Sequence, residues 1–415
     1  MMRGAATRAF VDVIAQAGRA FHMFPRLEPD AIMHVAGVSV DDDPRALEPL
    51  AAMCDSIQRD LRLAPRGRML MSNRLVEIIR QRRLLLDREA AGELPKAPES
   101  TPPIVVTGFP RSGTTLSHRI LSLAEDARSP QWCEVMQPSL EPGRDIEAAR
   151  RRRLTRYRIL VRGLQAMAPE LRRIHELVPD GPEECTQLHE IALDSESFGL
   201  LGPVDSYREW LDERDDARRR ERYEWQERCM RAIHADRSPS LRGERWVLKA
   251  PQHLCQLDDL FDRFPGALVV RMHRDPITCM ASTASLVACA ARIPTHGLPP
   301  GLGEDLLKIF IDWQTRGDEG TLRHSDRVLE IHYDDLVHEP ITFVERVHEA
   351  AGIPATGEHL DRVRNHLGRR PHHHFGRHQY SIADYGLDEG DVREELAEHI
   401  ERIDSIPRIT RQLVP

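Results

Sequence analysis

The sequence predicts a three-layer α/β fold with a mainly parallel central sheet flanked by helices. Short β-branched runs alternate with helical segments along most of the chain, which is the pattern of a parallel sheet with helical crossovers. The first of these runs, IVVTG at 104–108, ends in a glycine and leads directly into a helical segment. Residues 1 to about 100 read as helices and form an extension to this fold.

The bulk composition is that of an ordinary globular protein. The chain has 415 residues, 30% of them charged and 40% hydrophobic, with a formal net charge of -8. A chain of this length can bury a substantial core. The negative net charge argues against general nucleic-acid binding. Any anion site must therefore be a local concentration of donor groups within an acidic protein.

The N-terminal segment predicts an amphipathic helix. Its apolar residues Phe10, Val13, Ile14 and Ala17 fall on one face at helical spacing. The segment lacks the long apolar core of a signal peptide, and no stretch of the chain approaches ~18 uninterrupted apolar residues, so we expect no integral membrane span. Its few arginines leave a role at a membrane surface open. The seven scattered cysteines, without any Cys-x-x-Cys pair, indicate reduced thiols in a cytoplasmic protein.

Proline and serine mark a boundary after the first hundred residues. KAPESTPP at 96–103 has the composition of a connector. We therefore predict a helical N-terminal region over 1–100 and a second domain over 101–415, with a helical insert at about 140–240. Three further strands are expected after the first one, within RWVLKAP (245–251), ALVVRMHRDP (267–276) and RVLEIHYDDLV (327–337).

The turn after the first strand predicts an anion site. It carries glycines and hydroxyl side chains: Gly108, Ser112, Gly113, Thr114 and Thr115. Backbone N–H groups converge at such a strand–turn–helix junction, and the helix N-terminus adds about half a positive charge. Arg111 can supply a forked cation to a phosphate. The fold is therefore expected to be of the P-loop type, but the Lys of the usual Gly-Lys-Ser/Thr ending is missing, which makes a magnesium triphosphate site less favourable.

A second pair of residues restricts the class of ligand that the protein can bind. Arg274 follows the third predicted strand, and Ser282 comes eight residues later in a helix expected to start near Pro276. Together they can hold one phosphate. Two separate phosphate-binding sites predict a nucleotide that is phosphorylated at two positions.

These motifs resemble the sulfotransferase family that uses 3′-phosphoadenosine 5′-phosphosulfate (PAPS). GFPRSGTTL resembles the family's 5′-phosphosulfate loop, and the spacing from Arg274 to Ser282 resembles its 3′-phosphate motif. VLKAPQHL, FPGALVVRMHRDP and HYDDL follow in the expected order, so that the resemblance covers residues 103 to about 390. The nearest subgroup consists of bacterial members with a helical N-terminal extension, and the loop itself is similar to that of tyrosylprotein sulfotransferases.

The resemblance implies roles for single residues. The 5′-phosphosulfate is expected to contact the loop residues Pro110, Arg111, Ser112, Gly113, Thr114 and Thr115. Arg274 and Ser282 are expected to hold the 3′-phosphate, and Arg377 belongs to a late basic segment near the 3′-phosphate or adenine. Lys249 matches the lysine that stabilises charge on the leaving phosphate. Arg111 is expected to share in this charge stabilisation.

The general base is open between two residues. Glu134, in SPQWCEVMQP, resembles the glutamate some twenty residues after the loop in tyrosylprotein sulfotransferases. His253 lies four residues after Lys249 and would share its face if a helix has begun there. A histidine suits neutral pH, whereas a glutamate would benefit from a raised pKa. We favour Glu134 over His253.

The sequence thus predicts sulfuryl transfer from PAPS to a hydroxyl or amine acceptor, with release of adenosine 3′,5′-bisphosphate (PAP) and no need for a metal. Two alternatives stay open: a P-loop kinase acting on a small alcohol, and an inactive PAP-binding scaffold. The acceptor is expected to be a small molecule, a lipid or a carbohydrate, and a homo-oligomer is left open.

Overall fold

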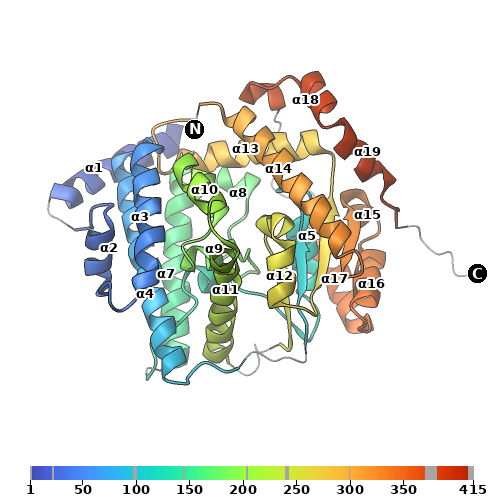
Figure 1. Cartoon of the computed structure of the whole chain (residues 1–415), viewed down its shortest axis with the longest axis horizontal. Helices are drawn as coiled ribbons and strands as arrows, with labels where there is room; N and C mark the ends of the chain where they lie inside the picture. The colour runs from blue at the N-terminus through green and yellow to red at the C-terminus, as the bar shows by residue number, and fades with distance from the viewer. Residues whose placement is uncertain are drawn as a thin grey trace, which may run out of the picture.

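The centre of the molecule is a five-stranded sheet with the order β2-β3-β1-β4-β5 (Figure 1). The computed structural model describes residues 2–20, 23–96, 101–143, 145–201, 204–238, 243–298, 300–369 and 381–409. The strands are β1 (Ile104–Thr107), β2 (Ala127–Arg128), β3 (Arg245–Lys249), β4 (Leu268–His273) and β5 (Val328–His332). Four of them lie within the predicted runs. The short strand β2 was not predicted, because two residues carry no periodic signal.

Every pairing in this sheet is parallel. Val106 of β1 lies opposite Lys249 of β3 on one side and Val270 of β4 on the other. The carboxyl ends of the three strands therefore meet at one edge, where open α/β sheets bind their ligands. The predicted α/β fold with a mainly parallel sheet is confirmed.

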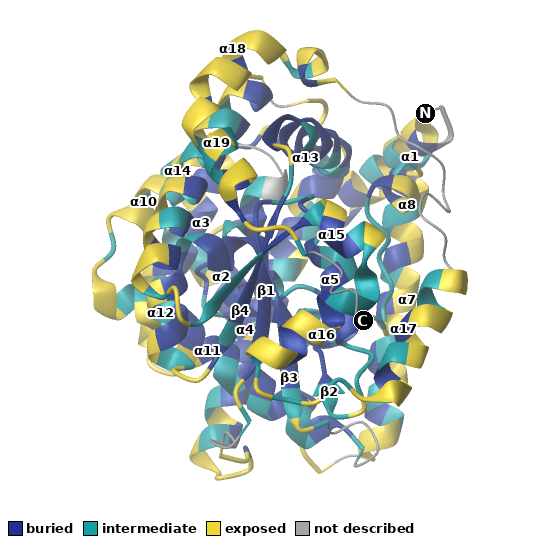
Figure 2. Cartoon of the chain, turned by 90° about the vertical axis from the view of Figure 1, so that its right-hand side faces the viewer, coloured by how far each residue is buried: buried dark blue, intermediate teal, exposed yellow. Residues whose placement is uncertain are grey.

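Alternate residues of the strands enter two different cores, as expected for strands buried on both faces. On one face, Val106 and Val270 pack with α5 (Thr114–Leu121), α16 (Pro340–Ala350) and α17 (Gly357–Arg369). On the other face, Leu248 and Val269 pack with α12 (Leu257–Arg263). Figure 2 shows the buried strands between these helices.

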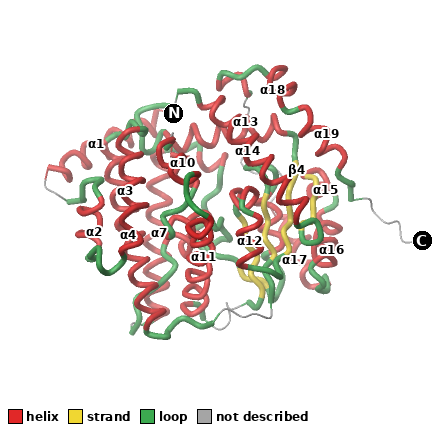
Figure 3. The backbone as a smooth tube through the Cα atoms, viewed as in Figure 1, coloured by secondary structure: helices red, strands yellow, loops and turns green. Residues whose placement is uncertain are grey.

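Helices flank the sheet throughout its length (Figure 3). Besides α16 and α17, those that follow β4 and β5 are α13 (Pro276–Ala291), α14 (Leu302–Arg323), α15 (Tyr333–His338), α18 (Glu389–Glu395) and α19 (Ala397–Ser405). The described part of the chain also contains the 3₁₀ helices η1 (Glu196–Leu201), η3 (Pro251–Cys255) and η4 (Ile382–Tyr385).

The N-terminal region is helical, as the sequence predicts, and lies at the opposite end of the molecule from α15, α16 and α17 (Figure 1). Its helices are α1 (Met2–Ala20), α2 (Pro29–Ala36), α3 (Pro44–Arg59) and α4 (Pro65–Ala90). The segment between β1 and β3 contributes α6 (Trp132–Met136), α7 (Ile146–Met167), α8 (Leu171–Ile174), α9 (Thr186–Ile191), α10 (Asp205–Asp212) and α11 (Asp216–Asp236).

One hydrophobic cluster joins these regions. Leu50 of α3 and Leu75 of α4 belong to the same buried cluster as Tyr223 of α11 and Leu248 of β3. The division of the chain at residue 100 stays a prediction, but the two sides of that boundary share a core. Within the described residues, no helix is both long and apolar enough to cross a bilayer.

Candidate active site

The turn after β1 has an unusual backbone that positions its polar groups. Gly108 has φ +141°, and a Cβ there would lie 2.5 Å from the carbonyl oxygen of Met272 on β4. Gly113 has φ +101°, and a Cβ there would lie 2.6 Å from the Tyr333 ring. Only glycine fits these close approaches. Helix α5 begins at the next residue, Thr114, so that the predicted strand–turn–helix junction is confirmed.

Arg111 adopts the left-handed region with φ 73°, which costs a non-glycine residue about 1–2 kcal/mol. Two contacts hold it there. Its Nε donates to Ser282 Oγ at 3.1 Å, and its carbonyl oxygen accepts from Arg274 Nη1 at 3.1 Å. Ser282 and Arg274 are the two residues of the second predicted motif, so the fold brings both motifs together. Thr283 adds a hydrogen bond to Pro110 O at 3.3 Å.

A cavity of about 710 Å³ opens beside this turn. Its lining includes Arg274 and five of the six predicted loop residues: Pro110, Arg111, Gly113, Thr114 and Thr115. Ser112 and Ser282 are 1% and 3% exposed and are not among the described lining residues. The Ser112 hydroxyl is a buried polar atom for which no partner is found among the described residues.

The cavity continues from the turn between mainly apolar walls. They come from α4, α6, α8, η1 and α13 and include Met71, Trp132, Leu171, Ile174, Phe198 and Leu286. Polar side chains such as Arg172, Arg173 and Glu196 also reach these walls. Arg74 Nε donates to Glu190 at 2.6 Å, and Ser197 Oγ donates to the other oxygen of Glu190 at 2.6 Å. The cavity thus has a cationic end at the turn and an apolar end between the helices.

Lys249 lies at the end of β3 but beneath the cavity wall. Its side chain is 1% exposed, and its Nζ forms an ion pair with Glu184, which lines the cavity. Burial raises the pKa of Glu184, but Lys249 and His175 outweigh burial and hold the pKa below its usual value. The predicted Lys249 is therefore separated from the cavity by its ion-pair partner Glu184, a residue that the sequence analysis did not single out.

The pKa of His175 is affected by several charged side chains around the cavity. Burial lowers the pKa of His175 to about 4, Glu184 opposes this shift, and the cations Lys249, Arg111 and Arg119 lower the pKa further. His175 also lines the cavity. It is therefore a neutral imidazole near pH 7 and can exchange hydrogen bonds without adding charge.

The preceding residue, Glu183, lines the cavity as well. Its carboxylate accepts from the Glu184 backbone N–H at 2.9 Å. Burial raises the pKa of Glu183, although Lys249 opposes the shift. Two adjacent carboxyl groups thus have pKa values displaced in opposite directions, a situation found where carboxyl groups take different roles in acid–base chemistry.

Glu134, the favoured base of the sequence analysis, is not among the described residues that line the cavity. The carboxylate is 1% exposed and accepts from Arg237 Nε at 2.9 Å, while Arg153 lies 3.5 Å away. It also caps α6 by accepting from the Gln131 backbone N–H. Burial raises the pKa of Glu134, but Arg237 and Arg153 more than offset this and lower it. Glu134 is positioned as a structural ion pair.

His253 is the second candidate base of the sequence analysis. It is fully buried in η3 and is not among the described lining residues. Its Nδ1 lies 2.8 Å from the Tyr223 hydroxyl, and burial, with help from His189, lowers its pKa well below the usual value. The side chain faces the protein interior, where it packs against the ring of Tyr223.

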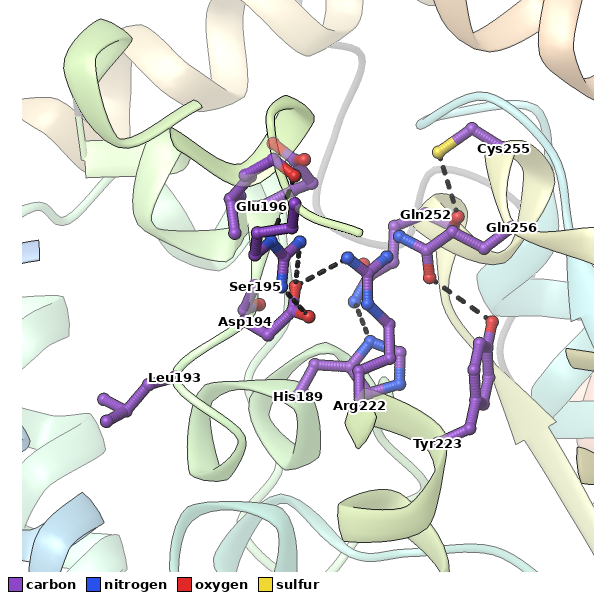
Figure 4. A network of polar contacts seen from close by, with 12 residues as sticks. His189, Leu193, Asp194, Ser195, Glu196, Arg222, Tyr223, Gln252, Cys255 and Gln256 are labelled. Atoms are coloured by element: carbon purple, nitrogen blue, oxygen red, sulfur yellow. Dashed lines mark hydrogen bonds and ion pairs between the residues drawn. The ribbon is translucent and has the colours of Figure 1, made fainter. Parts of the chain in front are cut away.

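Figure 4 shows the network of polar contacts around His189, Asp194 and Arg222, next to η3. Gln252 Nε2 lies 3.1 Å from His189 Nδ1, and Arg222 donates to Asp194 at 2.6 Å. Gln252 lines the cavity. The network therefore supports the cavity wall from behind, although Arg222 Nε is a buried polar atom for which no partner is found among the described residues.

The remaining predicted residue, Arg377, lies outside the described residues. Within the described ranges, no group of three or more His, Cys, Asp or Glu side chains is arranged to hold a metal ion. Tyr333, which the sequence analysis did not single out, also lines the cavity. The Arg274 guanidinium carbon lies over the Tyr333 ring, 4.1 Å from the ring centroid. An Arg–aromatic stack of this kind fixes the planar guanidinium beside the turn.

The structure is that of an α/β protein with a cavity at the carboxyl edge of a parallel sheet, where Arg111 and Arg274 line one end. The family model described as "Sulfotransferase family" matches residues 102–357. The chain belongs to this family, and it is an enzyme that transfers a sulfuryl group. The kinase and scaffold hypotheses receive no support from this match.

Relatives from mycobacteria agree with this assignment. The chain is 26% identical over 313 residues to the omega-hydroxy-beta-dihydromenaquinone-9 sulfotransferase of Mycobacterium tuberculosis, covering 72% of this chain and 74% of the relative. The crystal structure of the sulfotransferase STF1 of M. tuberculosis matches with a TM-score of 0.72 and 26% identity, over 89% of this chain and 97% of that one. The structure of STF9 from Mycobacterium avium matches in fold, with a TM-score of 0.78 at 22% identity, over 92% and 98% of the two chains.

Proposed function

We propose that the chain transfers the sulfuryl group of PAPS to the hydroxyl group of a lipophilic alcohol and releases PAP. The observation that carries this proposal is the continuity of the cavity. Arg111, Thr114 and Arg274 line its cationic end, and the side chains from α4, α8 and η1 line its apolar end. A doubly phosphorylated nucleotide suits the first end, and an apolar acceptor suits the second.

The residues of the turn fit the donor. The buried Ser112 hydroxyl has no partner among the described residues, and Arg111 and Arg274 place two guanidinium groups at the same turn. Thr114 and Thr115 add hydroxyl donors at the start of α5. When bound, PAPS supplies the sulfuryl group. The residues of the turn hold and orient its phosphate groups, which is how most group-transfer enzymes lower the barrier.

Glu184 is the proposed general base. It lines the cavity, whereas Glu134 and His253 are turned into the protein. Its carboxylate is held by the Lys249 ammonium. When Lys249 turns toward the negative charge on the leaving phosphate, Glu184 loses its cationic partner. Burial then raises the proton affinity of the carboxylate, and it can take the proton of the acceptor hydroxyl.

The identity of the acceptor rests on two lines of support. The apolar walls of the cavity match a molecule that carries one hydroxyl group on a hydrocarbon body. The relative from M. tuberculosis is named for an omega-hydroxylated menaquinone. The proposed acceptor is accordingly a lipid or other largely apolar molecule with a terminal hydroxyl group.

Calorimetry with PAP and turnover of labelled PAPS test this function. We expect PAP to bind the wild type, and sulfuryl transfer to be faster with hydroxylated lipids than with sugars of similar hydroxyl acidity. Absence of PAP binding would overturn the donor. Equal or faster transfer to sugars would overturn the acceptor class.

A further inference from the structure

Helix α1 exposes a group of apolar side chains that no other part of the described chain covers. Phe10 is 67% exposed, Val13 65% and Ile14 49%, and Met23 just beyond the helix is 75% exposed. These four residues form the α1 patch. They are four of the ten large hydrophobic side chains that are exposed in the described residues. Contiguous exposed apolar residues of this kind mark interaction surfaces.

The opposite face of α1 is anchored, so the orientation of the patch is fixed. The Asp12 carboxylate accepts from the Arg66 backbone N–H at 2.9 Å and forms an ion pair with the Arg66 guanidinium. Arg8 donates to the Met167 carbonyl oxygen. A Cβ at Gly4 would lie 2.8 Å from that same oxygen, which shows how closely α1 approaches α7. The exposed face is therefore the outer side of a docked helix.

The charge of this segment differs in sign from that of the whole chain. Residues 1–27 contain four arginines and one aspartate, within a protein of net charge -8. Asp12 is paired with Arg66, and the exposed Arg26 lies 4.0 Å from Glu28, so that the exposed Arg19 near the end of α1 is the main positive charge beyond these pairs. An apolar helix face flanked by arginines is complementary to a bilayer that contains anionic lipids.

The patch also lies close to the apolar end of the cavity. Val11, on the inner side of α1, packs in one cluster with Leu171, Ile174 and Leu286, all of which line the cavity. Figure 2 shows α1 and α8 on the same side of the molecule. A single layer of apolar side chains thus connects the base of α1 with the cavity wall.

We propose that the α1 patch docks on the surface of an anionic lipid bilayer and so places the apolar end of the cavity next to membrane-held acceptors. The second half of this proposal rests on the proposed function, because it takes the acceptor to be lipophilic. The first half, docking on the bilayer, stands on the patch and its charge alone. The docking is peripheral and needs no membrane-spanning helix.

Flotation of the full-length chain with vesicles tests the docking. We expect it to bind vesicles of phosphatidylcholine and phosphatidylglycerol more tightly than vesicles of phosphatidylcholine alone. The double variant Phe10→Ser/Ile14→Ser should weaken this binding by about tenfold or more. The matched control is Ile159→Ser/Leu322→Ser, which removes two side chains that are 63% and 80% exposed elsewhere, and it should bind as the wild type does.

The assay separates docking from catalysis because no nucleotide is present. Vesicle binding without PAP binding would leave the docking standing and overturn the proposed function. A wild type that does not bind anionic vesicles, or a Phe10→Ser/Ile14→Ser variant that binds them equally well, overturns the docking. It is also overturned if sedimentation without lipid shows that this variant splits a wild-type dimer while neither protein binds vesicles, since the patch then contacts a second copy of the chain.

Discussion

Arg274 donates a hydrogen bond to the backbone carbonyl oxygen of Arg111 over 3.1 Å. This contact joins two segments that are more than a hundred and fifty residues apart in the sequence. It also crosses from β4 to the turn after β1, so the guanidinium braces the left-handed backbone of Arg111 while its plane stacks on Tyr333. Arg274 thus has a role in shaping the turn as well as a proposed role in binding phosphate.

Replacement of Arg274 by alanine should weaken PAP binding by about tenfold to a hundredfold, because a hydrogen bond to a charged group is lost together with the brace on the turn. Calorimetry measures the change. Arg274→Lys keeps a cation but not the forked geometry, so its PAP affinity should lie between those of the wild type and Arg274→Ala. Arg346→Ala, at an exposed arginine of α16, serves as a control. Unchanged PAP affinity in Arg274→Ala would contradict the assignment of this site.

Two replacements of Arg111 should differ in stability but agree in their effect on binding. Arg111→Gly relieves the left-handed backbone, whereas Arg111→Ala keeps it, so the glycine variant should be the more stable of the two by about 1 kcal/mol. Both variants lose the cation and should bind PAP more weakly than the wild type. Urea unfolding and calorimetry give the two quantities separately. Equal stability of the two variants would show that position 111 changes its backbone when the side chain is lost.

Glu184→Gln should reduce kcat by about a hundredfold to ten-thousandfold, the usual range for loss of a general base. PAP affinity should change little, because the amide oxygen still accepts a hydrogen bond from Lys249. Single-turnover kinetics with a hydroxylated lipid checks the rate. Glu190→Gln, which alters another carboxylate of the cavity wall, is the matched control. If the Glu184 and Glu190 variants lose the same modest amount of activity, the base is a different group.

Glu134→Gln should act on stability. Removing one partner of a buried ion pair leaves Arg237 uncompensated, at a cost of about 3–5 kcal/mol near pH 7. Because the folded-state pKa of Glu134 is lowered from 4.5, its stabilising effect is complete above that pH and is lost as the pH falls through the folded-state pKa. The difference between wild type and variant in urea unfolding should therefore shrink in acid. A stability difference that does not change with pH would contradict this account.

The strands and the strand–turn–helix junction were predictable because their signals are local. Four β-branched runs and the spacing from Arg274 to Ser282 can be read without knowing what lies opposite them. The candidate base was not predictable in the same way. Glu134 occupies the expected position along the chain, but Arg237, about a hundred residues later, turns its carboxylate inward.

Glu184 lies in a segment that is held by backbone hydrogen bonds, one of them to strand β3. The Cys185 backbone N–H donates to the Lys249 carbonyl oxygen at 2.8 Å, and Gln131 pairs with Pro182 in an isolated bridge. Neither contact leaves a trace in side-chain periodicity. The adjacent glutamates 183 and 184 were the one available signal, and a charged pair in a loop is usually a solvated surface.

The cluster that links Leu50 and Leu75 to Leu248 also limits how this enzyme can be divided. The segment 102–357 that identifies the family would, if expressed by itself, leave one side of that core facing water and would lack Met71 and Arg74 from the cavity. We therefore expect the segment 102–357 to fold poorly without the N-terminal helices. Grafting a different N-terminal region onto it would change both the lining of the cavity and the packing of the core in a single step.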